Sequence, residues 1–217
     1  MMLSPMGAEQ RKSMSFLSGL NLGEGRAKTL ANIISLILSA PTMAGVISIV
    51  FAFTFPKELG SIISPLQAAT VGILALAVLP VVPIFYCRIK GTVDLDVSER
   101  ERRPPFFIFA VLCYALGAVV FKIAQSNVMF KLALSYMFVS LGIVAITFFW
   151  KISVHTAGIA GPSTILVLAY GLSLLPIYLL TAASIWARIR LKAHTLAQAF
   201  MGATTAIAIT AAVYIAL

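Results

Sequence analysis

The chain is built from apolar runs about as long as a bilayer is thick, separated by short polar stretches. Such runs cover residues 29–55, 66–86, 106–123 and 128–150. A helix needs about 20 apolar residues to cross the hydrocarbon core. Hydrophobic residues make up 60% of the 217 and charged residues 11%, which excludes both an ordinary soluble domain and a disordered chain. The sequence therefore predicts an all-α, polytopic integral membrane protein with six to seven transmembrane helices.

The apolar stretch from Lys151 to Lys192 allows two topologies. Read as one span, about 162–186, it puts its polar ends on opposite faces of the membrane. Read as a hairpin of two helices, 153–173 and 176–190, it brings both ends to the same face. Its length favours one span, whereas the glycine and proline in its middle favour the hairpin. A final span is predicted at 194–217.

The predicted domain organisation is simple. Residues 29–217 form a single transmembrane domain, and residues 1–28 precede it. This first segment mixes basic residues with phenylalanine and leucine, which is typical of an amphipathic segment lying at the membrane surface. A frayed tail is the alternative.

Positive charge is concentrated on one predicted face. The chain has 16 Lys and Arg against 7 Asp and Glu, a net charge of +9. In the hairpin topology the N-terminus, the 87–105 loop, and the junctions at Lys151 and 188–194 share one face, which carries every basic residue except Lys57, Lys122 and Lys131. The positive-inside rule predicts that this face is cytoplasmic. In a membrane protein such charge points to anionic lipid head groups rather than to nucleic acid.

Three polar clusters on this face contain the only two histidines. The first, 96–104, ends in Arg-Pro, and the second, 152–155, reads Ile-Ser-Val-His. The third begins at Arg188 and places His194 six residues later. A single histidine at a helix boundary is most simply a polar residue at the membrane interface. Histidines and arginines gathered on one face, however, are the groups that a phosphate site needs.

The clusters resemble the three motifs of the type-2 phosphatidic acid phosphatase superfamily. Those motifs are Lys, six residues, Arg-Pro; then Pro-Ser-Gly-His; then Ser-Arg, five residues, His, three residues, Asp. Order and spacing match over residues 96–202. The resemblance implies that His194 is the nucleophile that attacks phosphorus and that His155 protonates the leaving alkoxide. It also implies that Gln198 stands where the family has the Asp that orients the nucleophile.

The same resemblance implies which residues hold the phosphate. They are Arg103, Arg188 and Ser153, with Asp96 at the position of the family's Lys. Lys151 or Lys192 could replace that Lys in space. The chemistry is reasonable in its own right. A neutral imidazole is a good nucleophile near pH 7, a second histidine can act as acid and then as base, and guanidinium groups stabilise charge on phosphate oxygens. Backbone N–H groups at the start of the helix near Ser153 would add an anion site.

The departures from the motifs bear on activity. Acidic Asp96 replaces a Lys, neutral Gln198 replaces an Asp, and Ala187, Ile152 and Val154 replace a Ser, a Pro and a Gly. A glutamine carbonyl can accept an imidazole N–H but cannot stabilise an imidazolium as a carboxylate does. Activity could therefore be attenuated, shifted in substrate or lost.

The predicted function is a membrane phosphatase that hydrolyses a lipid phosphate or polyprenyl (di)phosphate through a phospho-histidine, without metal or cofactor. Two alternatives stay open. One is a catalytically impaired relative that binds phospholipid head groups. The other is a magnesium-dependent intramembrane lipid transferase, because carboxylates in the 94–101 loop could ligate Mg²⁺. That loop also reads as a solvated run of paired charges. The expected partners are the phosphate-bearing substrate and membrane lipids, with no nucleic acid and an undetermined oligomeric state.

Overall fold

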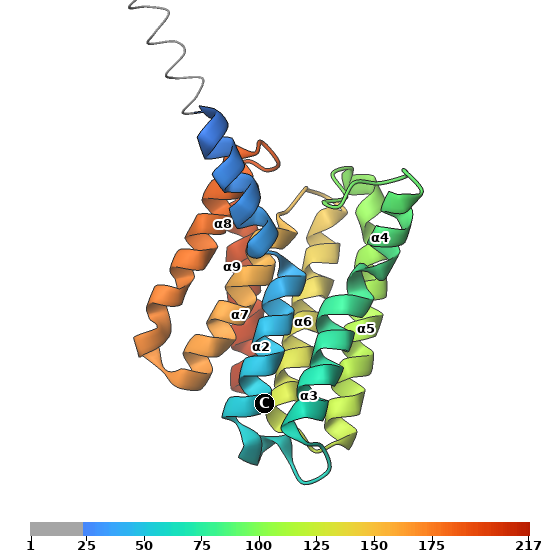
Figure 1. Cartoon of the computed structure of the whole chain (residues 1–217), viewed down its shortest axis with the longest axis vertical. Coiled ribbons are helices and arrows are strands. Elements are labelled where there is room, and N and C mark those ends of the chain that lie inside the picture. The colour runs from blue at the N-terminus through green and yellow to red at the C-terminus, as the bar shows by residue number, and fades with distance from the viewer. Residues whose placement is uncertain (1–23) are drawn as a thin grey trace, which may run out of the picture.

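The computed structural model describes residues 24–217, and this part of the chain folds into helices with no strand. The helices run side by side along the long axis of the molecule (Figure 1). The α-helices are α2 (Ala40–Thr54), α3 (Pro65–Gly72), α4 (Val82–Ile89), α5 (Arg103–Ile123), α6 (Asn127–Thr147), α7 (Val154–Tyr170), α8 (Tyr178–Arg190) and α9 (Leu196–Ala216). A further helix, Glu24–Ile37, precedes α2. The all-α prediction is confirmed. The predicted interfacial segment comprises residues 1–28, of which residues 1–23 lie outside the described part of the chain.

The described helices have the length and hydropathy of membrane spans. Five are long and apolar enough to cross a bilayer, and the bent pair formed by Glu24–Ile37 and α2 would be a sixth. Helix α7 is apolar too, but it has only 17 residues. The multi-pass membrane architecture predicted from the sequence is therefore confirmed, with five or six spans by this criterion.

The first predicted span, 29–55, is two helices rather than one. Glu24–Ile37 and α2 meet at an angle of 46°. The second helix starts afresh because the Ser39 side chain accepts a hydrogen bond from the backbone N–H of Thr42 at 3.4 Å. Pro41 occupies the first turn of α2, where its missing N–H leaves no bond unmade. The N-terminal helix lies at the end of the bundle that carries the polar loops (Figure 1).

The second span is irregular in its middle. Between α3 and α4 the chain passes through a π-helical segment, Ile73–Val78, and a 3-10 turn, Leu79–Val81. Pro80 and Pro83 have no N–H to donate to the preceding turn, and the regular α-helical ladder gives way around them. The whole still forms one continuous helical unit, Pro65–Ile89.

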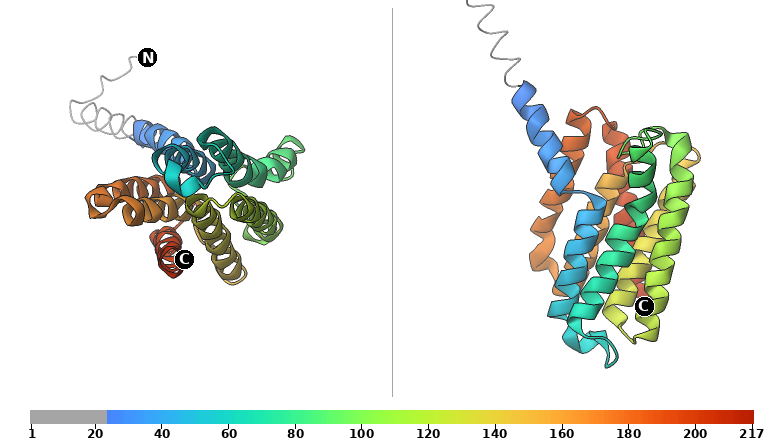
Figure 2. Two further views of the ribbon diagram at one scale, coloured as in Figure 1. Left: turned by 90° about the horizontal axis from the view of Figure 1, so that it is seen from below. Right: turned by 45° about the vertical axis from the view of Figure 1, so that its right-hand side comes forward.

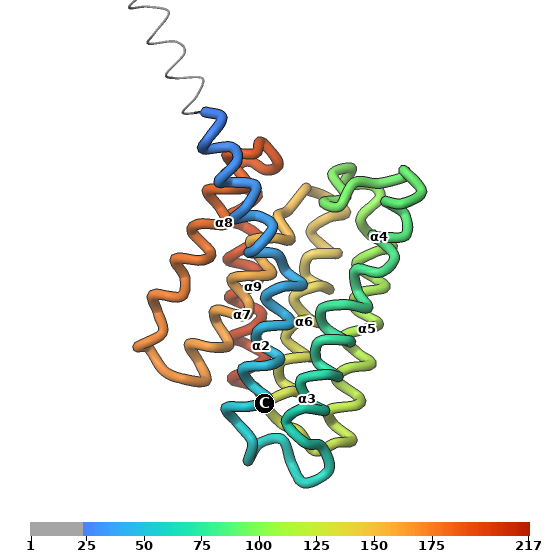
Figure 3. The backbone as a smooth tube through the Cα atoms, viewed as in Figure 1, coloured from blue at the N-terminus to red at the C-terminus, as the bar shows by residue number. Residues whose placement is uncertain are grey.

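The stretch between residues 151 and 192 is a hairpin. Helix α7 ends at Gly171, which adopts the left-handed φ of +96°, and a 3-10 segment, Leu172–Ile177, leads back into α8. The two arms pack on each other, and their turn lies opposite the polar loops (Figure 3). Of the two topologies that the sequence allowed, the structure has the one that returns both polar ends to the same side.

Helix packing holds the three motif-bearing segments together. Helix α5 packs on α6, and α9 packs on both α6 and α7, whereas α8 lies at the outer edge of the bundle (Figure 2). The contact between α7 and α9 is close because it is lined by small side chains such as Ala157, Ala199 and Ala203, all buried. A Cβ placed on Gly202 would come within 2.3 Å of the Ser153 carbonyl oxygen.

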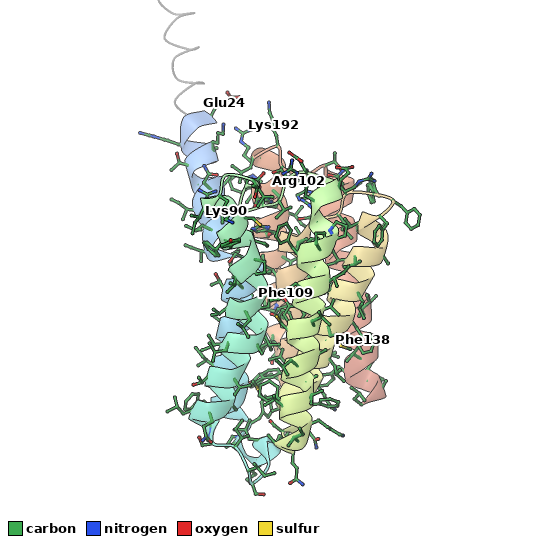
Figure 4. All side chains as sticks on the ribbon, turned by 90° about the vertical axis from the view of Figure 1, so that its right-hand side faces the viewer. Glu24, Lys90, Arg102, Phe109, Phe138 and Lys192 are labelled. Carbon is green, nitrogen blue, oxygen red and sulfur yellow. The ribbon has the colours of Figure 1, made fainter. Side chains whose placement is uncertain are left out.

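Two ends of the bundle differ in polarity. One end, called here the site end, carries the loops at 91–99, 148–153 and 191–195. Figure 4 shows Glu24, Lys90, Arg102 and Lys192 gathered there, with Phe109 and Phe138 further along the helices. The far end carries the loop at 55–64 and the turn at 124–126.

Candidate functional site

Arg103, the first residue of α5, joins two of the polar loops. Its side chain is buried, with 2% of the residue exposed. Nε donates to the Val97 carbonyl oxygen at 2.8 Å, and Nη1 donates to the Ile152 carbonyl oxygen at 2.9 Å. Val97 adopts a left-handed φ of +44°, which is unfavourable for a β-branched residue. The hydrogen bond from Arg103 helps to hold the loop in that conformation.

Arg188 lies in the last turn of α8 and is equally buried, at 2% exposure. Nη2 donates to Asp96 Oδ2 at 2.7 Å, and Nη1 donates to the hydroxyl of Ser35 at 2.9 Å. Nε is buried and has no hydrogen-bond partner. Ser35 belongs to the N-terminal helix and was not anticipated from the sequence, because no motif marks it and only the tertiary fold brings it here.

Asp96 stands between Arg188 and His155. Its Oδ1 lies 3.8 Å from His155 Nε2, while its other oxygen accepts from Arg188. Burial by itself would raise the pKa of Asp96, but the hydrogen bond and charge of Arg188 outweigh it and lower that pKa. The residue is therefore a carboxylate at neutral pH. In this structure its contacts are with Arg188 and His155, and its place in a phosphate site stays a prediction.

The start of α7 positions His155. The Ser153 side chain caps the helix by accepting a hydrogen bond from the backbone N–H of Thr156 at 3.4 Å. The backbone N–H of Ser153 donates to the backbone carbonyl oxygen of Gln198 at 3.2 Å. The Thr156 hydroxyl donates to the Ala199 carbonyl oxygen at 2.8 Å. These bonds join α7 to the first turn of α9. Ser153 is fully buried and its hydroxyl oxygen caps the helix, and its contact with phosphate stays a prediction.

His194 follows α8 and is 7% exposed. The backbone N–H groups of Ala193 and His194 donate to the Arg188 carbonyl oxygen, which fixes the histidine relative to that arginine. Its Nδ1 is buried without a hydrogen-bond partner. Burial lowers the pKa of His194 to about 3, and the positive charges of Arg103, Arg188 and Lys151 act in the same direction. The imidazole is therefore neutral at physiological pH.

Gln198 has a contact that its motif position did not suggest. Its Oε1 accepts from the Thr195 N–H at 3.1 Å, and its own N–H donates to the Thr195 hydroxyl at 3.3 Å. This reciprocal arrangement is a capping box that starts α9. The Gln198 side chain also lies near His194, where it slightly opposes the fall in that residue's pKa. The spacing of Thr195 and Gln198 is the usual capping-box signature, so the sequence held the signal.

Lys151 lies at the edge of this group, in the junction between α6 and α7. Burial lowers its pKa, and the nearby charges of Arg103 and Arg188 contribute to that shift. Arg103, Arg188 and Lys151 thus bring three positive charges to this group, whereas Asp96 is the carboxylate in contact with Arg188. The imbalance, together with the unpaired Nε of Arg188 and Nδ1 of His194, makes the site suited to an anion with several acceptor oxygens.

All the residues singled out from the three motifs are at the site end. The two histidines lie at the same end of the bundle, as a common site requires. Within residues 24–217 no group of three or more histidine, cysteine, aspartate or glutamate side chains is placed to hold a metal ion.

Comparisons with known proteins add nothing to this geometry. No protein-family model, no curated protein and no solved structure matches the chain.

Proposed function

We propose that this protein is a membrane phosphatase that removes phosphate from a lipid phosphate or a polyprenyl (di)phosphate. The observation that carries the proposal is the convergence of Arg103, Arg188, His155 and His194 at one end of the bundle, from segments far apart in the chain. The resemblance of the three motifs to the type-2 phosphatidic acid phosphatase superfamily supports the same conclusion. The exposed apolar faces of the helices would keep the lipid tail of the substrate in the membrane.

The proposed reaction has two steps. In the first, a neutral ring nitrogen of His194 attacks phosphorus, the P–N bond forms, and the P–O bond to the lipid breaks as His155 donates a proton to the leaving oxygen. In the second, His155 takes a proton from water, the hydroxide displaces His194, and inorganic phosphate leaves. Arg103 and Arg188 stabilise the charge on the non-bridging oxygens throughout.

Two features favour His194 as the nucleophile. Its imidazole is neutral because burial and its cationic neighbours lower its pKa to about 3. Its Nδ1 is also not engaged by any hydrogen bond. A nucleophile must present an unprotonated lone pair, and His194 has one at neutral pH.

The test is release of inorganic phosphate by purified protein from a panel of lipid phosphates and polyprenyl diphosphates. We expect release in the presence of EDTA, and we expect His194→Ala to reduce it below about one part in a thousand. Arg190→Ala, an exposed change four residues away, is the matched control and should keep full activity. Strict dependence on magnesium together with a requirement for an acceptor lipid would instead support a transferase.

A second candidate function is head-group binding without turnover. It is favoured by Gln198, which carries no charge and whose Oε1 is engaged by the Thr195 N–H in the cap of α9. On this alternative the arginines bind lipid phosphates and His194 never becomes phosphorylated. Binding of a short-chain lipid phosphate by ultracentrifugation or calorimetry, with no phosphate released from any substrate of the panel, would favour it over the phosphatase.

We further place the site end in the cytoplasm. The support is the same charge asymmetry noted in the sequence, since basic residues accumulate in cytoplasmic loops. Only Lys57, Lys122 and Lys131 lie toward the far end among the basic residues of 24–217.

A further inference from the structure

Asp96 departs from the family motifs by a reversal of charge. A lysine would stand at this position, and a carboxylate has the opposite charge. Yet its two oxygens face two of the residues proposed for catalysis: Oδ2 accepts from Arg188 Nη2 at 2.7 Å and Oδ1 lies 3.8 Å from His155 Nε2. With 36% of its side chain exposed, it is also the more accessible partner of the Arg188 ion pair, whose arginine is 3% exposed.

The Asp96 carboxylate uses only one of the two hydrogen-bond donors on one edge of the Arg188 guanidinium. Nε–H and the outer N–H of Nη2 point the same way from a guanidinium, and a carboxylate or phosphate usually occupies both. Here Asp96 occupies Nη2 alone, and Nε is buried with no partner. An anion with tetrahedral oxygens, seated further along this edge, would satisfy both donors. It would also displace Asp96, because two anions repel each other when they share one cation.

We propose that Asp96 is a displaceable internal ligand of Arg188, which phosphate replaces, and that the released carboxylate then pairs with His155. This inference rests on the proposed function for the identity of the incoming anion. His155 is the nearest group that can become a cation, and it takes one proton from solvent as the pair forms. A carboxylate at Nε2 stabilises the imidazolium, and the proton on Nδ1 is then the one donated to the leaving oxygen. Substrate binding would thereby prepare the acid that the first step needs.

The proposal predicts effects of opposite sign on binding and on turnover. In Asp96→Asn the competitor for Arg188 has lost its charge, so phosphate binds more tightly. The same variant leaves His155 without a carboxylate, so protonation of the leaving oxygen is slower. A residue that merely shapes the loop would instead weaken binding and slow turnover together when it is replaced.

The first experiment measures binding of inorganic phosphate to the purified full-length protein by calorimetry. We expect Asp96→Asn to lower the Kd for phosphate about tenfold, a change of about 1.4 kcal/mol. Glu99→Gln is the matched control, because it removes one negative charge from the same loop. Glu99 pairs with the exposed Arg102. Its Kd should equal that of the wild type. An unchanged or higher Kd in Asp96→Asn, or an equal gain in Glu99→Gln, would overturn the proposal.

The second experiment measures kcat and KM on a short-chain lipid phosphate. We expect Asp96→Asn to lower both, and Asp96→Glu, which keeps a carboxylate, to recover part of kcat. A rise in KM with a fall in kcat would contradict the proposal. If no variant releases phosphate while Asp96→Asn still binds it more tightly, the phosphatase proposal fails and the displacement stands. If turnover is normal and the Kd does not fall, the displacement fails alone.

Discussion

Individual side chains of the site are held by backbone groups more than by one another. Arg103 uses two donors on carbonyl oxygens of separate loops. A buried guanidinium whose donors were unpaired would be costly, so these bonds fix its position before any ligand arrives. In Arg188 the Nε atom is buried and has no hydrogen-bond partner. Arg103 therefore organises the two loops as well as being a candidate phosphate ligand, whereas Arg188 carries the buried Nε donor that has no partner.

The burial of His194 predicts how stability depends on pH. Burial and the neighbouring cations lower its folded-state pKa to about 3, against 6.5 for an unperturbed histidine. The unfolded chain therefore binds a proton more readily than the folded protein below pH 6.5. The stability gained from keeping the imidazole neutral is fully present above that pH and is lost as the pH falls toward 3. Between pH 7 and pH 5 the loss from this residue is about 2 kcal/mol.

The measurement is chemical unfolding in detergent at pH 7 and pH 5. The wild type should lose stability over this interval, and His194→Gln, which cannot be protonated, should lose about 2 kcal/mol less. Lys192→Ala serves as the control and should behave like the wild type. An equal loss in His194→Gln and the wild type would mean that His194 is not held neutral by the fold.

At the scale of the element, local chemistry explains where most helices begin. Pro104 and Pro105 occupy the first turn of α5, where proline is tolerated, and the turn 124–126 separates α5 from α6. Ser153 and Thr195 cap the two helices that carry the second and third motifs. The exception is the first span, where Ser39 restarts a helix inside a continuous apolar run. Apolar composition does not reveal such a break, because residues 29–37 before it and 40–54 after it are both predominantly apolar.

The contact between α7 and α9 depends on the absence of a side chain at Gly202. A Cβ there would lie 2.3 Å from the Ser153 carbonyl oxygen, a backbone atom that cannot move without its helix. We expect Gly202→Ala to lower the free energy of unfolding by about 1–3 kcal/mol. It should also reduce phosphate release, because the start of α7 carries His155.

Thermal unfolding in detergent measures this effect. Gly45→Ala in α2 is the matched control, since a Cβ there meets its nearest neighbour at an ordinary 3.9 Å. That variant should be as stable as the wild type or slightly more stable, because alanine stabilises a helix by up to about 1 kcal/mol relative to glycine. Equal melting temperatures for the two variants would show that the α7–α9 contact can relax around an added methyl group.

For the molecule as a whole, the hairpin decides which loops meet. Because α7 and α8 turn back at Gly171, the first turn of α7 and the last turn of α8 lie at the same end, together with the start of α5. A single span through the same residues would have separated His155 from His194 by the thickness of the membrane. The existence of a common site is thus a consequence of topology rather than of any one contact.

Topology in cells is testable by labelling introduced cysteines. In a background lacking Cys87 and Cys113, we expect Lys57→Cys to react with a membrane-impermeant maleimide on intact cells. Lys90→Cys, at the site end, should react only after the membrane is permeabilised. Both positions are exposed. Labelling of both from the same side would contradict the topology, and the reverse pattern would contradict the cytoplasmic placement.

The sequence by itself determined the membrane class, the approximate helices and the histidines and arginines that meet at the site end. These follow from hydropathy, proline positions and motif spacing, all of which are local properties. Only the tertiary structure decided between one span and a hairpin, brought Ser35 to Arg188, and placed Asp96 between Arg188 and His155. Those contacts join segments from 59 to 153 positions apart in the chain. Their formation depends on how whole helices pack, which no local pattern of residues encodes.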